Sequence, residues 1–147
     1  MPLKLFTIGF TKKSAEVFFT RLQQAGVKRL VDVRRNNNSQ LAGFSKRDDL
    51  AYFLRSLAGI EYVHLLDLAP TQELLERYKR ADRDWPAYER DFLSLIESRR
   101  IETTVPREQL DNSCLLCSED KPHHCHRRLV AEYLRDHWGD VAIEHLV

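Results

Sequence analysis

Long apolar runs are missing from this 147-residue sequence, and none approaches the roughly 20 residues that are needed to cross a bilayer. The first nine residues also lack the extended apolar stretch of a signal peptide. We therefore expect a cytoplasmic protein with no membrane partner.

Excess charge and abundant cysteine are missing as well. The 23 basic and 22 acidic side chains leave a net charge of +1, which argues against a generic basic nucleic-acid binder. A local basic patch can still form, because binding depends on where the charges lie. Three cysteines, an odd number, do not make a secreted disulfide framework. Hydrophobic residues at 43% are ordinary for a globular protein with its own core.

Short apolar runs alternate with amphipathic segments along the chain. Strands are predicted at residues 3–9, 29–34, 61–68, 114–117 and 141–146, and helices begin near Ser14, Ser45, Thr71, Asp84 and Pro122. Residues 100–112 are expected to form an irregular connector. This alternation predicts a single α/β domain over residues 1–147, with three layers (helix–sheet–helix) and a mainly parallel sheet of four to five strands.

The sequence predicts where the first helix begins and ends, and where the second begins and which residues face inward. Ser14 can cap the first helix, which Gly26 ends. Ser45 with Asp48 resembles a capping box that opens the second helix. The inward face of that second helix is predicted to carry Leu50, Phe53, Leu54 and Leu57.

The carboxyl ends of parallel strands share one edge of the sheet, and ligands bind in the crevice there. That edge is expected to gather Gly9, the pair Asp32 and Arg34, the polar loop that contains Asn37 and Ser39, and residues 117–127. Residues far apart in the sequence thus become neighbours through topology.

Four motifs occur in order along nearly the whole chain: Thr7-Ile8-Gly9, Asp32-Val33-Arg34, Ser39-Gln40-Leu41-Ala42-Gly43-Phe44 after Asn36-Asn37, and Leu116-Cys117-Ser118-Glu119 with Cys125-His126-Arg127. In these motifs the sequence resembles the domain of unknown function family 488. Many members carry a proline after Asp-Val-Arg, where this chain has three asparagines. The resemblance implies an α/β fold and supplies no activity.

Cysteine and histidine near the last strand have the residue types of a zinc site. Cys114 and Cys117 lie three apart in a predicted strand, however, and therefore face opposite sides. Zinc is thus disfavoured and no metal ligands are assigned, although Asp32 with Glu119 could hold magnesium. Cys117 is a weaker candidate nucleophile, because His123 stands where phosphate-binding cysteine loops need an arginine.

The last helix is expected to orient its own first turn. Its inward stripe continues back to His126, which should point toward the sheet edge, while Arg128 lies on the other side and can pair with Glu132. First-turn N–H groups and Arg127 could hold a phosphate or carboxylate. Alternatively, His126 is a hydrogen-bonded core residue, and a structural clamp between Asp32 and Arg127 is the expected ion pair.

Two functions remain open on these residues. In the first, an enzyme acts on a phosphate-bearing small molecule or a nucleic-acid end. The anion is bound by Arg34 and Arg127, and protons are handled by Asp32, Glu119 or His126. The remaining ligand-binding candidates are Gly9, Asn37, Ser39 and Cys125. In the second, a non-catalytic binding or adaptor module uses the same cluster as a structural ion network. The oligomeric state is left open.

Overall fold

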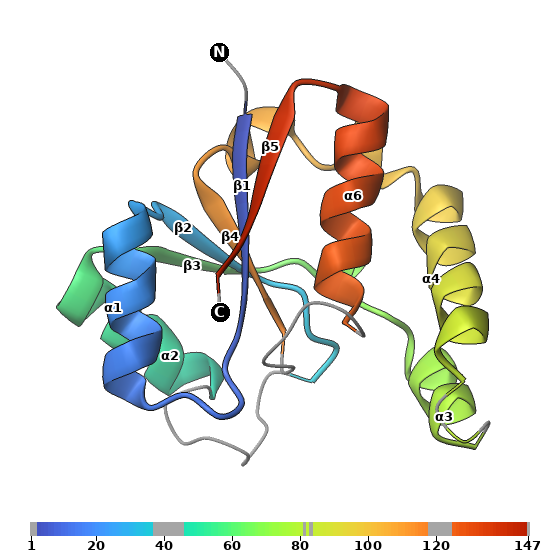
Figure 1. Cartoon of the computed structure of the whole chain (residues 1–147), viewed down its shortest axis with the longest axis horizontal. Helices are drawn as coiled ribbons and strands as arrows, with labels where there is room; N and C mark the ends of the chain where they lie inside the picture. Colours follow the sequence, from blue (N-terminus) through green and yellow to red (C-terminus); the bar gives the residue numbers. More distant parts are fainter. Residues whose placement is uncertain (1–2, 37–45, 81, 83, 118–124, 147) are drawn as a thin grey trace.

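A five-stranded parallel sheet forms the centre of the molecule (Figure 1). The computed structural model describes residues 3–36, 46–80, 82, 84–117 and 125–146. The strands are β1 (Leu3–Gly9), β2 (Arg29–Asp32), β3 (Glu61–His64), β4 (Ser113–Cys117) and β5 (Val141–Leu146), and they lie in the order β3-β2-β4-β1-β5. Every adjacent pair is parallel, so the predicted sheet is confirmed.

Helices cover both faces of this sheet, as Figure 1 shows. One face carries α1 (Ala15–Ala25) and α2 (Arg47–Phe53), and α2 continues into the π-helical turn Leu54–Ala58. The other face carries α3 (Gln72–Arg80), α4 (Trp85–Arg99), α5 (Ile101–Thr104) and α6 (His126–Trp138). The three predicted layers are therefore confirmed. In the described ranges, no helix combines the length and apolar character that a membrane crossing requires.

Two hydrophobic clusters fill the spaces between the layers. Leu30 belongs to the cluster under α1 and α2, whereas Val31 and Val33 belong to the cluster under α4 and α6. In β4, Cys114 lies in the first cluster and Cys117 in the second. The predicted alternation of both strands, with its separation of the two cysteines, is thus confirmed.

Several predicted boundaries are wrong for local reasons. The strand β2 ends at Asp32 because the backbone N–H of Arg34 turns back to the Asp32 carboxylate. The next strand, β3, stops at His64, and a 3₁₀ turn over Leu66–Leu68 replaces its expected end. The last helix begins at His126 rather than Pro122, since Cys125 has an extended backbone with φ −140°.

The connector at 100–112 is not irregular. Arg100 takes a left-handed conformation with φ 51°, which ends α4 and lets its carbonyl accept from the N–H groups of Thr103 and Thr104. These two hydrogen bonds form the first turn of the short helix α5. A 3₁₀ turn over Arg107–Leu110 follows it.

The start and the inner face of the second helix also differ from prediction. Lys46 is its N-cap and gives no side-chain hydrogen bond, so the predicted capping box is wrong; Ser45 itself lies outside the described residues. Leu50 and Leu54 are buried as predicted, whereas Leu57 is 58% exposed. The π-helical turn rotates Leu57 away from the core.

Candidate functional site

A buried ion pair lies at the carboxyl end of β2. The Asp32 carboxylate accepts hydrogen bonds from Arg34 Nε at 2.8 Å and from an Arg34 terminal nitrogen at 2.7 Å. It also accepts from the Arg34 backbone N–H at 3.0 Å and from the Tyr62 hydroxyl at 2.6 Å. The Arg34 guanidinium lies 5.3 Å from the centre of the Phe10 ring. The expected clamp between Asp32 and Arg127 is therefore wrong, because Arg34 and Tyr62 occupy the carboxylate.

This geometry limits what Asp32 can do. A carboxylate has about four lone-pair positions, and four donors face this one. Accepting a proton from a substrate or binding magnesium would require Asp32 to give up these bonds. The contacts suit a group that fixes Arg34 and the end of β2.

Two side chains of β3 complete this corner, and neither was among the predicted site residues. Tyr62 contacts Asp32, and His64 Nε2 donates to the carbonyl oxygen of Arg34 at 2.7 Å. The strand register pairs Leu30 with Tyr62 and Asp32 with His64, which brings both side chains beside the ion pair. The polar residues at alternate positions of β3 were the available signal, but the strand order needed to interpret it was unknown.

The first turn of α6 reaches the same edge. His126 Nε2 donates to the Val33 carbonyl oxygen at 2.6 Å, so the imidazole points toward the sheet as predicted. Arg127 is fully buried and donates from a terminal nitrogen to Cys117 Sγ at 3.4 Å. Arg128 turns the other way and pairs with Glu89 of α4 at 3.0 Å and with Glu132 at 3.4 Å.

Burial decides the charge of two groups near this edge. It lowers the pKa of His126 from 6.5 to about 4, and the positive charge of Arg127 acts in the same direction; the bond to Val33 and the charge of Asp32 oppose it. His126 is therefore neutral at pH 7. Burial also raises the pKa of the Cys114 thiol, which keeps that core cysteine protonated.

Two cysteines flank the approach to α6. Cys117 ends β4 and Cys125 caps α6, and the two side chains are joined sulfur to sulfur, with their Cα atoms 7.3 Å apart. Gly9 lies opposite Cys117 in the pairing of β1 with β4, at the same edge. The structure thus brings Gly9, Cys117, Cys125 and Arg127 to one edge of the sheet. The predicted site residues Asn37, Ser39 and Glu119 lie outside the described residues.

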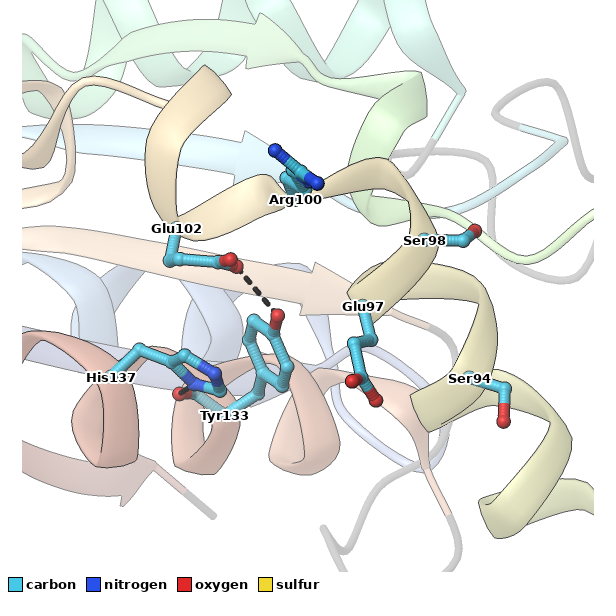
Figure 2. Close-up of a pocket in the computed structure, with 7 residues that line it drawn as sticks. All are labelled: Ser94, Glu97, Ser98, Arg100, Glu102, Tyr133 and His137. Carbon is cyan, nitrogen blue, oxygen red and sulfur yellow. Dashed lines mark hydrogen bonds between the residues drawn. The ribbon is translucent and has the colours of Figure 1, made fainter.

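A separate open hollow of about 580 Å³ lies between α4, α5 and α6. It is lined by Ser94, Glu97, Ser98, Arg100, Glu102, Tyr133 and His137 (Figure 2). The Tyr133 hydroxyl donates to Glu102 at 2.5 Å, a bond that lowers the pKa of Glu102. None of the residues predicted for the site belongs to this lining, so the hollow is distinct from the carboxyl edge.

Comparison with known proteins places the chain in a family. No curated protein and no solved structure matches it. The model of a family described as a domain of unknown function, DUF488, matches residues 14–134. That match spans most of the 147 residues, so this protein belongs to the DUF488 family.

Proposed function

We propose that this protein is a cytoplasmic enzyme that binds and acts on a phosphate-bearing ligand, a nucleotide or nucleic-acid end, at the carboxyl edge of the sheet. One observation supports the proposal. The ends of β2 and β4 meet the first turn of α6 there, through His126 on the Val33 carbonyl and Arg127 on Cys117. Parallel sheets bind their ligands outside the carboxyl ends of their strands.

The start of α6 supplies suitable donors for an anion. The N-cap residue Cys125 makes no side-chain capping bond, and the Arg128 N–H bonds to the Cys125 carbonyl, so the anion is assigned to the N–H groups that precede Arg128 in this turn. Such groups bind phosphate, and a nearby guanidinium adds charge and directional hydrogen bonds. This role is assigned first to Arg127, because Asp32 engages Arg34 through two guanidinium nitrogens.

Proton transfer falls to His126 or Glu119 in this proposal. His126 Nε2 carries the proton that it donates to Val33, so Nδ1 of the neutral ring holds a lone pair. The Asp32 carboxylate serves to position Arg34. The remaining ligand contacts are assigned to Gly9, Asn37, Ser39 and Cys125.

Thermal unfolding in the presence of matched ligand pairs tests binding. Adenosine monophosphate is compared with adenosine, and a 5′-phosphorylated oligonucleotide with its unphosphorylated form. At a concentration about 100 times Kd a ligand stabilises by about 2.7 kcal/mol, which for a chain of this size raises Tm by roughly 5–10 °C. We expect that rise only with a phosphate, and a smaller one in Arg127→Lys, which keeps the charge but loses the fork of donors. Equal shifts within each pair, or none, would contradict binding.

The non-catalytic module is a second candidate, and the bond pattern of Asp32 favours it. A buried pair that satisfies a carboxylate completely is typical of a structural ion network. The two functions differ in turnover. Incubation of the wild-type protein with the bound phosphate ligand, followed by mass spectrometry, should show a converted ligand for an enzyme and an unchanged one for a binding module.

A further inference from the structure

Two sulfur atoms and an imidazole meet where β4 ends and α6 begins. One donor atom from each of Cys117, Cys125 and His126 lies within 4.8 Å of the other two. Within the described ranges this is the single group of cysteine, histidine, aspartate and glutamate side chains with the spacing of metal ligands. The two cysteines are 2% and 3% exposed and His126 is partly buried, so both sulfur atoms are shielded from bulk water.

The backbone positions of the two cysteines suit a shared metal ion. A covalent disulfide usually spans about 4.4–6.8 Å between Cα atoms, and a separation above about 7 Å requires backbone movement. Cys117 and Cys125 are 7.3 Å apart at Cα. Two thiolates on a tetrahedral zinc ion, each about 2.3 Å from the metal, lie roughly 3.8 Å from one another and so need a wider span.

The hydrogen bond of His126 prepares its ring for a metal. A carbonyl oxygen can only accept, so Nε2 carries the proton that it shares with Val33 O at 2.6 Å, and Nδ1 holds the lone pair. Metal-bound histidines almost always donate their second ring N–H to a carbonyl or carboxylate, which fixes the ring. His126 already has that partner.

Arg127 places a positive charge beside the first sulfur. Its terminal nitrogen donates to Cys117 Sγ at 3.4 Å, inside the protein. A neighbouring cation favours the thiolate over the thiol, and the thiolate is the form that binds metals.

We propose that, once a thiol reductant supplies the two electrons that open the bond between the two sulfur atoms, Cys117, Cys125 and His126 bind a thiophilic divalent metal ion, with zinc the best fit, through two thiolates and Nδ1 of His126. Two cysteines with one histidine are a zinc ligand set, whereas magnesium prefers oxygen. Zinc was disfavoured from the sequence because of Cys114, but that residue lies in the hydrophobic cluster on the other face and is not needed. The metal site goes beyond the phosphate-binding proposal, and either can fail without the other. With Nδ1 of His126 on the metal, proton transfer in that proposal is assigned to Glu119.

Cobalt titration of the reduced, chelator-stripped full chain tests the site. Co²⁺ should bind as one equivalent, with the visible bands of a tetrahedral ion and an ultraviolet thiolate-to-cobalt charge-transfer band, and Zn²⁺ should displace it. Cys117→Ser and Cys125→Ser should each weaken binding at least about 100-fold, and His126→Gln at least about tenfold. Cys114→Ala is the matched control and should bind as the wild type does.

Measurements on the wild type decide the question even if a ligand variant does not fold. Zinc should protect two thiols from alkylation in the folded protein, and those thiols should map to Cys117 and Cys125. A folded, reduced wild type that shows no charge-transfer band and no protection would overturn the site. So would a metal-free protein whose mass and peptide map show that Cys117 and Cys125 form a disulfide after purification without added oxidant.

Discussion

Three of the four hydrogen bonds to Asp32 come from one residue, Arg34, only two positions along the chain. Two residues so close in sequence enclose a very short loop when they pair, so forming the pair costs little chain entropy. Tyr62 then ties the pair to β3. The ion pair is therefore a local structure, and a hydrogen bond from the neighbouring strand β3 holds it in position.

Asp32→Asn should lower the free energy of unfolding by about 3–5 kcal/mol, because it deprives the buried Arg34 guanidinium of its carboxylate. Urea unfolding measures this loss. Tyr62→Phe serves as the comparison, since it removes one donor to the same carboxylate and leaves the ion pair in place, and should cost about 1.5–3 kcal/mol. Similar small losses in both variants would show that the pair contributes little.

His126 should make stability depend on pH. Its pKa is about 4 in the folded protein and 6.5 when unfolded, so between these values the unfolded chain binds more protons. Stability is then fully present above pH 6.5 and falls as the pH drops toward 4, by up to about 3 kcal/mol.

Urea unfolding across pH 4–7, with a chelator present to keep the protein metal-free, measures this dependence. His126→Gln should reduce the slope by at most about 1.4 kcal/mol per pH unit. A wild type and a variant with parallel pH profiles would mean that His126 titrates normally in the folded state.

The sequence indicated which residues share the edge, but not which of them bond. Strand periodicity placed Asp32 and Arg34 on one side of β2, and helix periodicity turned His126 toward the sheet. The choice of Arg34 over Arg127 by Asp32 depends on the backbone turn after the strand. Neither that turn nor the meeting of Cys117 with Cys125 leaves a periodic signal.

At the scale of elements, the exposed Leu57 shows how a helix can change phase. The Gly59 backbone N–H bonds to the Leu54 carbonyl, five residues back, in place of the usual four. Residues within this wider turn no longer follow the 3.6-residue repeat of an α-helix, on which the inward position predicted for Leu57 depended. Leu54 keeps its place in the core, and Leu57 faces solvent.

The same substitution at these two leucines should therefore have different effects. Leu54→Ala should lower the free energy of unfolding by about 2–5 kcal/mol, because it leaves a cavity in a fully buried position. Leu57→Ala should change it by no more than about 0.5 kcal/mol. Chemical denaturation measures the free energy of unfolding of both variants, and a large loss at Leu57 would show that this side chain is buried.

Three capping residues were predicted correctly from the sequence. Ser14 accepts from the Val17 N–H, Asp84 from the Ala87 N–H, and Gly26 ends α1 with φ 75°, all as the sequence predicts. These signals are local, since a cap needs only the next few residues. The end of β2 depends on the Arg34 N–H bonding back to the Asp32 carboxylate, and the end of β3 on the 3₁₀ turn that follows it. Neither turn carries a capping signal, which explains why these boundaries were wrong.

At the scale of the whole molecule, one sheet separates two hydrophobic clusters. The cluster under α4 and α6 includes both tryptophans at its border, Trp85 and Trp138. The cluster under α1 and α2 contains Ile60 and carries no tryptophan among its described members. Because β1, β2 and β4 contribute side chains to both clusters, we expect the two faces to unfold as one unit, which is the single domain predicted from the sequence.

Ile60→Val tests this cooperativity, since it removes one methyl group on the face opposite the tryptophans. The variant should lose about 0.5–1.5 kcal/mol. Tryptophan fluorescence reports the α4–α6 face, while far-ultraviolet circular dichroism reports the helices of both faces. In one cooperative domain, the urea midpoint shifts equally by both probes, although the change is remote from either indole. If the fluorescence midpoint stayed at its wild-type value while the dichroism midpoint fell, the sheet would join two units that unfold separately.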